Sequence, residues 1–268
     1  MTDKYAERWS TGPVLAAGDG GVLRLTLNRP ARKNAMTVEG WGTIFDILHC
    51  AETDPEIRVV VIAGAGGDFC AGADISSAPA GHPLERVSRI SKTAQSLHDF
   101  PKPVIAKVEG AAVGAGWSLA LGCDLVVAST SARFSQLFVR RALSIDFGGS
   151  WLLPRLVGLQ QAKRLVLLGE FVSAQEAERL GLLTWVKEPG EIGPFVDDLA
   201  ARLAAGPPVA LAQNKSLLNQ GATLSFTDAL ANEARAQAVN QATEDFPLAL
   251  QAFADRTEAS YTGRWALP

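Results

Sequence analysis

Through most of the chain, short apolar runs alternate with segments of helical character. The apolar runs are rich in β-branched and aliphatic residues and occupy residues 22–27, 59–63, 104–108 and 125–128. Each run has the length of one strand. In the intervals between them, helices are expected to begin near Thr37, Pro83 and Gly116. Strands that are apolar on both faces and separated by helices indicate a largely parallel sheet in an α/β fold.

The pattern changes near residue 190. After the stretch KEPGEIGP the chain is helical almost throughout, with a break at Pro207-Pro208. We therefore expect two parts: an α/β core over residues 1–190 and a helical C-terminal segment over residues 191–268.

Composition narrows the classes of partner. Hydrophobic residues make up 47% and charged residues 20% of the 268 positions, which is typical of a folded domain with a substantial core. The formal net charge of −3, without a basic stripe, gives no reason to expect nucleic acid or a membrane surface as a partner. The three cysteines, Cys50, Cys70 and Cys123, lack the spacing of a disulfide framework or a zinc site. Because the N-terminal stretch MTDKYAERWS also lacks the apolar run of a signal peptide, we expect a cytoplasmic protein with reduced thiols and no metal.

Two glycine-rich stretches follow predicted strands. GAGGDFCAGADI at residues 64–75 follows RVVVIA, and EGAAVGAGWSLALGCD at residues 109–124 follows KPVIAKV. Small residues after a strand allow a ligand to approach the backbone closely, and unpaired N–H groups at the start of a helix then face that ligand. Close packing of a helix against a strand selects the same small residues, so these stretches alone do not define a site.

Two other kinds of site fit these stretches less well. Phe69 stands where a dinucleotide-binding fingerprint needs glycine, and no Walker lysine follows either stretch, so nucleotide binding is disfavoured. Ser118 lies in a sequence one residue short of the G-x-S-x-G nucleophile elbow, and none of the histidines stands in a recognisable motif. We interpret Ser118 as a small polar residue in the first turn of a helix rather than as a nucleophile.

Five strings in the chain occur in the order typical of one family. They are NRPARKNA (28–35), DFCAGADI (68–75), KPVIAKVEGAAVGAG (102–116), CDLVVASTSARF (123–134) and GGSWLLPRLVG (148–158). Over about residues 14–187 the chain thus resembles the enoyl-CoA hydratase/isomerase, or crotonase, family. The resemblance implies a spiral of β-β-α units, followed by C-terminal helices that pack against neighbouring subunits in a homo-oligomer, a trimer or a dimer of trimers. It also implies an acyl-CoA thioester substrate, with coenzyme A as part of the substrate and no other cofactor.

The resemblance gives the two glycine-rich stretches a shared task. The backbone N–H groups of Ala73 and Ala115 are expected to bind the thioester carbonyl oxygen. Proton loss beside that carbonyl places negative charge on the oxygen, and two fixed donors in a water-poor site stabilise this charge. The CoA moiety is expected to lie along six further residues: Arg29, Lys33, Ala35, Ala71, Asp74 and Ile75. The loop over residues 76–83 is expected to form a lid near the acyl chain.

The chain departs from the family's hydratases at two positions. Those enzymes use two glutamates, whose positions correspond here to Ser118 and Phe138, and neither side chain can transfer a proton near neutral pH. Hydration by the two-carboxylate route is therefore disfavoured. The stretch DFGGSWLLPRLVG instead resembles a branch containing the phenylacetyl-CoA ring-epoxide isomerase and related enoyl-CoA isomerases. In that branch, an aspartate at the position of Asp146 is the acid/base group.

Asp146 is therefore the candidate acid/base residue, since one carboxylate suffices to remove a proton at one carbon and return it at another. Apolar residues around it (Ile145, Phe147, Phe138 and Trp117) are expected to raise its pKa by desolvation. Trp117 and Phe138 are also candidate contacts of the acyl group. From its position alone, Asp146 fits better as the N-cap of a helix over residues 148–157, and only the resemblance favours catalysis.

Three alternatives to an isomerase stay open. The chain could be a hydratase in which Asp146, alone or with Ser118, adds water to an unsaturated thioester. It could bind CoA esters without any catalysis. A thioesterase that uses Ser118 ranks last.

Overall fold

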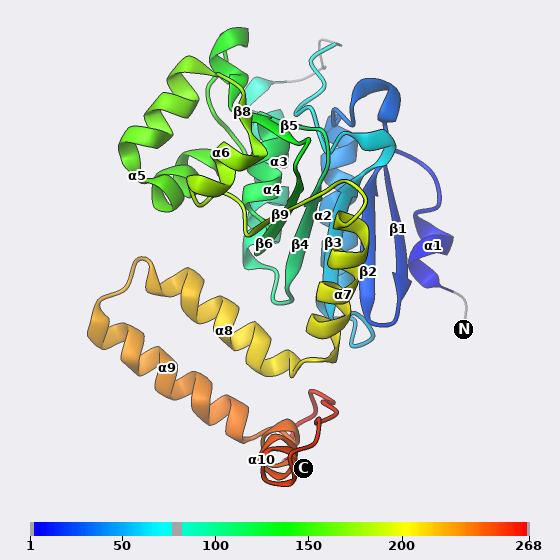
Figure 1. Cartoon of the computed structure of the whole chain (residues 1–268), viewed down its shortest axis with the longest axis vertical. Coiled ribbons are helices and arrows are strands. Elements are labelled where there is room, and N and C mark those ends of the chain that lie inside the picture. Colours follow the sequence, from blue (N-terminus) through cyan, green and yellow to red (C-terminus); the bar gives the residue numbers. More distant parts are fainter. Residues whose placement is uncertain (1–2, 77–81, 267–268) are drawn as a thin grey trace.

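The computed structural model of the chain describes residues 3–76 and 82–266 (Figure 1). Its core is a six-stranded sheet with the order β1-β2-β3-β4-β6-β9, beside a three-stranded sheet with the order β5-β7-β8. The strands of the larger sheet are β1 (Val14–Asp19), β2 (Val22–Leu27), β3 (Val59–Gly64), β4 (Val104–Val108), β6 (Leu125–Ser129) and β9 (Trp185–Lys187). Those of the smaller sheet are β5 (Ala111–Val113), β7 (Arg133–Ser135) and β8 (Val172–Ser173).

The predicted strands are confirmed. The runs at 22–27 and 104–108 are β2 and β4, and the runs at 59–63 and 125–128 each extend by one residue as β3 and β6. All pairings in the larger sheet are parallel, except that β1 pairs antiparallel with β2. The predicted helix starts are also present, at α2 (Val38–Glu52), α3 (Pro83–Asp99) and α4 (Ala115–Leu121). Thr37 caps α2, because its side-chain oxygen accepts a hydrogen bond from Gly40 N at 3.1 Å.

Helices cover both faces of the larger sheet. The alternation along β3 directs Val60 and Ile62 into the main core, where they join residues of α2 and α4. Val59 and Val61 point to the opposite face, where they meet α7 (Ile192–Ala205). Helix α7 lies after the expected core boundary at residue 190, yet it packs on the sheet. The part of the chain that projects from the core therefore begins later, at α8.

The remaining helices are α1 (Lys4–Arg8), α5 (Gly149–Leu168), α6 (Ala174–Arg179), α8 (Pro208–Gly221), α9 (Phe226–Gln241) and α10 (Asp245–Asp255). Helix α5 is interrupted at Gly158, which has a φ of 73°. Within the described ranges, no helix is long and apolar enough to cross a membrane.

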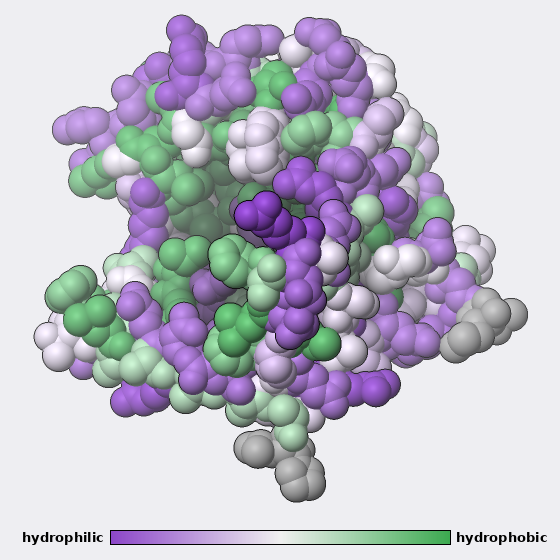
Figure 2. Space-filling model, turned by 60° about the horizontal axis from the view of Figure 1, so that its bottom comes forward, coloured by the Kyte–Doolittle hydropathy of each residue, from purple (hydrophilic) through white to green (hydrophobic). Residues whose placement is uncertain are grey.

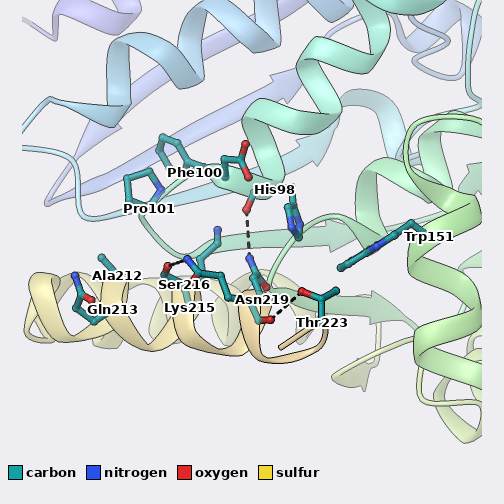
Figure 3. A pocket seen from close by; sticks show the side chains of 12 residues that line it. His98, Phe100, Pro101, Trp151, Ala212, Gln213, Lys215, Ser216, Asn219 and Thr223 are labelled. Carbon is teal, nitrogen blue, oxygen red and sulfur yellow. Dashed lines mark hydrogen bonds between the residues drawn. The ribbon is translucent and has the colours of Figure 1, made fainter. Parts of the chain in front are cut away.

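Helices α8–α10 form an arm beneath the core (Figure 1). Two side chains of α8 hold it there. Lys215 Nζ lies 2.8 Å from Asp124 Oδ2 and donates to the carbonyl oxygen of Lys102 at 3.2 Å. Asn219 points from α8 toward the end of α3, where its Nδ2 donates to the carbonyl oxygen of His98 at 3.3 Å (Figure 3). The arm is thus tied to the core by polar contacts at the ends of β4, β6 and α3.

We expect Lys215→Met to loosen α8 without unfolding the core. The Lys215 side chain is only 10% exposed, and a charge-assisted contact of this kind contributes about 1.5 kcal/mol. Amide hydrogen exchange over residues 208–221 should therefore accelerate about tenfold. Lys92→Met, which removes an exposed lysine of α3, should leave the exchange of α8 unchanged. Equal exchange in the two variants would show that Lys215 does not anchor the arm.

Candidate active site

The two glycine-rich stretches, residues 64–75 (the first turn) and residues 109–124 (the second turn), meet at one cavity of about 350 Å³. The first turn supplies Ala71, Gly72 and Ala73, and the second supplies Ala115 at the start of α4. Asp146, from the loop before α5, lines the same cavity. The structure therefore brings together the three residues that the sequence indicated for catalysis, although they are separated by about 30 to 70 positions in the chain.

Backbone pairing holds the two turns against each other. Cys70 N donates to the carbonyl oxygen of Ala111, and Val113 N donates to that of Cys70, both at 2.9 Å. Gly72 has a φ of 92°, and a Cβ atom placed on it would lie 2.8 Å from the carbonyl oxygen of Val113 and 3.5 Å from Ala115 N. Only glycine fits this position well, because the conformation is left-handed and the second turn is too close for a side chain.

The backbone N–H groups of Ala73 and Ala115 differ from those of their neighbours in their hydrogen bonding. Gly72 N contacts Cys70 Sγ at 3.4 Å, Asp74 N donates to the carbonyl oxygen of Met36, and Gly114 N donates to that of Ser135. By contrast, neither Ala73 N nor Ala115 N donates a hydrogen bond to any residue in the described part of the chain. Two backbone donors are therefore available at the wall of the cavity.

Asp146 does not cap α5. The N-cap of that helix is Gly148, with a φ of 77°, and no side chain accepts a hydrogen bond there. The helix-cap interpretation is therefore wrong. Asp146 Oδ1 is buried and has no hydrogen-bond partner among the described residues. Burial raises the pKa of Asp146 to about 6.

The loop that carries Asp146 is held from both sides. The Phe147 ring, which is buried, lies 4.7 Å from the ring of Trp41. A Cβ atom on Gly149 would lie 2.7 Å from Ser118 Oγ and 2.8 Å from Ile145 Cδ1, so a larger residue cannot replace Gly149 without displacing the loop. The carboxylate is thus presented by a loop whose flanking residues pack tightly into the core.

The expected apolar wall is only partly correct. Phe138 lines the cavity, but Trp117 is fully buried in the core, with its ring 5.4 Å from that of Phe134. Trp117 is therefore not placed to contact an acyl group. Other apolar side chains complete the wall: Ile75, Val113, Leu137, Leu143 and Phe171.

Ser118 lies outside the cavity. It is fully buried, and its Oγ accepts a hydrogen bond from Gln136 Nε2 at 3.4 Å. No histidine lines the cavity in the described ranges. A nucleophilic serine with a histidine base is therefore absent from this wall.

The residues expected along CoA fall into two groups. Lys33, Ala71 and Ile75 line the cavity. Arg29 instead supports the first turn, because its guanidinium lies 2.7 Å from Asp74 Oδ2 and also donates to the carbonyl oxygen of Ala35.

The carboxylate of Asp74 accepts hydrogen bonds from two residues, Arg29 and Ser76. Hydrogen bonds from the Ser76 hydroxyl and amide, and then from Arg29, hold its pKa well below the usual range. Residues 77–81 of the expected lid lie outside the described residues. His82, at its end, caps α3 by accepting a hydrogen bond from Leu84 N at 3.2 Å.

A second and larger cavity, of about 580 Å³, lies beneath the core (Figure 3). It is bounded by the end of α3, the start of α5 and the side chains of α8, including His98, Trp151 and Lys215. None of the residues predicted for the site lines it. Despite its size, it does not contain the three groups that define a candidate reaction centre.

Comparison with known proteins identifies the family. The family model described as enoyl-CoA hydratase/isomerase matches residues 17–264. The chain is 35% identical to the 1,2-epoxyphenylacetyl-CoA isomerase of Escherichia coli, over 94% of this chain and 98% of the relative. It is also 35% identical to the short-chain-enoyl-CoA hydratase of Clostridium acetobutylicum, over 91% and 95%.

The crotonase fold expected from the five strings is confirmed as well. The crystal structure of an enoyl-CoA hydratase from Polaromonas sp. JS666 superposes with a TM-score of 0.87 at 36% identity, covering 93% of this chain and all of that one. The chain therefore belongs to the enoyl-CoA hydratase/isomerase family and is an enzyme that acts on acyl-CoA thioesters.

Proposed function

We propose that this enzyme moves a double bond within an enoyl-CoA thioester. Asp146 is the acid/base group, and the N–H groups of Ala73 and Ala115 form the oxyanion hole. The observation that carries the proposal is the buried, unpartnered Asp146 Oδ1 in the same cavity as two unpaired backbone donors. In the described ranges, Asp146 is the only carboxylate in that cavity.

The reaction follows from these three groups. The thioester carbonyl oxygen accepts hydrogen bonds from both amides, which polarises the carbonyl and acidifies the neighbouring carbon. For a 3-enoyl ester, the Asp146 carboxylate removes a proton from C2, and negative charge spreads over the dienolate to the carbonyl oxygen. The protonated Asp146 then returns the proton to C4, so the double bond ends between C2 and C3 and the carboxylate is regenerated.

The raised pKa suits this exchange of roles. A carboxyl group with a pKa of about 6 is mostly ionised at pH 7 and is a stronger base than an ordinary aspartate. In its protonated form, the same group readily returns the proton to the dienolate. The residues at the positions of the two hydratase glutamates, Ser118 and Phe138, supply no second carboxylate to hold a water molecule. These features favour an isomerase. Sequence identity alone does not decide between the two activities, because the chain is 35% identical both to the 1,2-epoxyphenylacetyl-CoA isomerase and to the short-chain-enoyl-CoA hydratase.

Solvent-deuterium incorporation into 2-enoyl-CoA and 3-enoyl-CoA esters, followed by mass spectrometry, tests the proposal. We expect deuterium to enter both esters as they interconvert, without a gain in mass equal to one water. Formation of the 3-hydroxy ester would instead identify a hydratase. Binding without exchange would indicate a protein that has lost catalysis, and release of free CoA would indicate a thioesterase.

We also propose that the arm of α8–α10 mediates homo-oligomer contacts, in a trimer or a dimer of trimers. Large apolar side chains of the arm are exposed to solvent: Leu218, Phe226, Leu230, Phe246, Leu250 and Phe253. Figure 2 brings this underside forward and shows apolar patches on it. Exposed apolar area of this kind favours association. Sedimentation or light scattering of the intact chain would measure the number of subunits.

A further inference from the structure

In the part of the chain that the structure describes, three cations and one carboxylate, that of Asp146, line the cavity. The cations differ in how they are partnered. Lys33 Nζ forms an ion pair with Asp68 Oδ2 at 3.1 Å. The guanidinium groups of Arg133 and Arg141 form neither an ion pair nor a hydrogen bond with any residue in the described part of the chain. Both arginines are exposed at the cavity wall, and their positive charges have no counter-ion among the described residues.

The fold directs both arginines toward this wall. Arg133 begins β7, and its guanidinium lies over the ring of Phe171, 5.5 Å from the centroid. Phe171 also lines the cavity, so it holds the Arg133 side chain along the wall. Arg141 ends the 3-10 helix Leu137–Arg141, whose first two residues line the cavity as well.

The two arginines stand apart from the acid/base group although they share its cavity. Among the described residues, no ion pair or hydrogen bond joins either guanidinium to the Asp146 carboxylate, and Asp146 Oδ1 has no hydrogen-bond donor. A substrate can therefore lie between a reacting carbon at Asp146 and an anionic group at the arginines.

We propose that Arg133 and Arg141 bind a carboxylate at the far end of the acyl group, so that the preferred substrates are CoA monothioesters of dicarboxylic acids. This assignment rests on the proposed function, which places the thioester between Asp146 and the two amides. Guanidinium groups match a carboxylate in geometry and form two parallel hydrogen bonds with it. Strand β7 and the 3-10 helix that follows it carry Arg133, Phe138 and Arg141, and the chain continues from there to Asp146. The residues expected along CoA come instead from the first turn and the segment before α2. The arginines therefore belong to the part of the chain that carries the acid/base group.

Isothermal titration with saturated esters tests the assignment, because these esters lack the double bond that the reaction moves. Adipyl-CoA and hexanoyl-CoA have acyl chains of equal length and differ by one terminal carboxylate. We expect adipyl-CoA to bind about 10- to 100-fold more tightly, which is the usual effect of a hydrogen-bonded charge. Arg141→Gln and Arg133→Gln should each reduce this preference and leave the affinity for free CoA unchanged.

Arg140→Gln is the matched control. Arg140 neighbours Arg141 on the same 3-10 helix and is exposed as Arg141 is, but it does not line the cavity. It should retain the full preference for adipyl-CoA. Equal affinity of the wild-type enzyme for the two esters would overturn the proposal. So would a loss of affinity in the Arg133 and Arg141 variants that is the same for both esters and for free CoA, since the arginines would then hold CoA phosphates. Failure of the isomerase proposal would appear separately, as absence of deuterium exchange in every ester.

Discussion

Replacing Asp146 with asparagine should reduce proton exchange by about 100- to 10,000-fold, because an amide cannot accept the substrate proton at neutral pH. The affinity for a saturated CoA ester should change little, since Asn has almost the same shape. For the wild-type enzyme, the exchange rate at low substrate concentration should rise with pH through about 6, as the carboxyl group ionises. The measurement is deuterium uptake by the 3-enoyl ester across pH 5–8. Unaltered exchange in Asp146→Asn would remove this residue from the mechanism.

The same substitution has an expected effect on stability that depends on pH. Because burial raises the pKa of Asp146 from 3.8 to about 6 in the folded chain, the folded state binds more protons than the unfolded state between these values. The wild-type protein therefore loses stability as the pH rises through this range, and the variant does not. Asp146→Asn should be more stable by about 3 kcal/mol at pH 8 and nearly equal to wild type at pH 4. Urea unfolding at pH 4 and pH 8 distinguishes this outcome from simple disruption, which would lower stability at both.

Gly72→Ala should lower the rate by about 100- to 1000-fold, the cost of losing one oxyanion-hole donor in other enzymes. The new methyl group would meet the carbonyl oxygen of Val113 at 2.8 Å, so the first turn must move away from Ala115 N. The two amides would then no longer converge on one oxygen atom. The effect should appear in kcat for isomerisation, measured from the absorbance of the conjugated 2-enoyl thioester.

Gly67→Ala separates this effect from backbone strain. Gly67 lies earlier in the same turn, with a φ of 87° that is close to the 92° of Gly72, but a Cβ atom there meets nothing within 4 Å. Its alanine variant should lose about 1 kcal/mol of stability and keep nearly full activity. If both variants lost the same activity, strain in the loop would explain the result, and the approach of the two turns would not.

Much of the framework could be predicted from local patterns. The four apolar runs became strands because their β-branched residues are buried on both faces of a parallel sheet, as at Val59 to Ile62. The smaller sheet escaped prediction. Its strands have two or three residues each, and they form only because segments far apart in the chain pair, as when Phe134 of β7 lies between Ala112 of β5 and Val172 of β8. Such pairing leaves no periodic signal in the sequence.

The direction of individual side chains was harder to predict than their location in the chain. All seven residues of α4 are buried, so the helix has no polar face that could show which side meets the cavity, and Trp117 turned out to face the core. Arg29 and Asp74 were each expected along CoA, but an ion pair between residues 45 positions apart cannot be read from either one alone. Arg133 and Arg141 gave no signal because a cation beside a short strand or turn is usually solvated.

The two backbone donors also bear on how the site would be found by mutagenesis. Positions 73 and 115 are already alanine, so a scan that replaces each side chain with alanine would pass over both. The amide groups there can be kept through many side-chain changes, while Gly72 cannot readily accept even a methyl group. Evolution should therefore restrict the amino acid at position 72 more strongly than those at positions 73 and 115, although the latter two supply the hydrogen-bond donors.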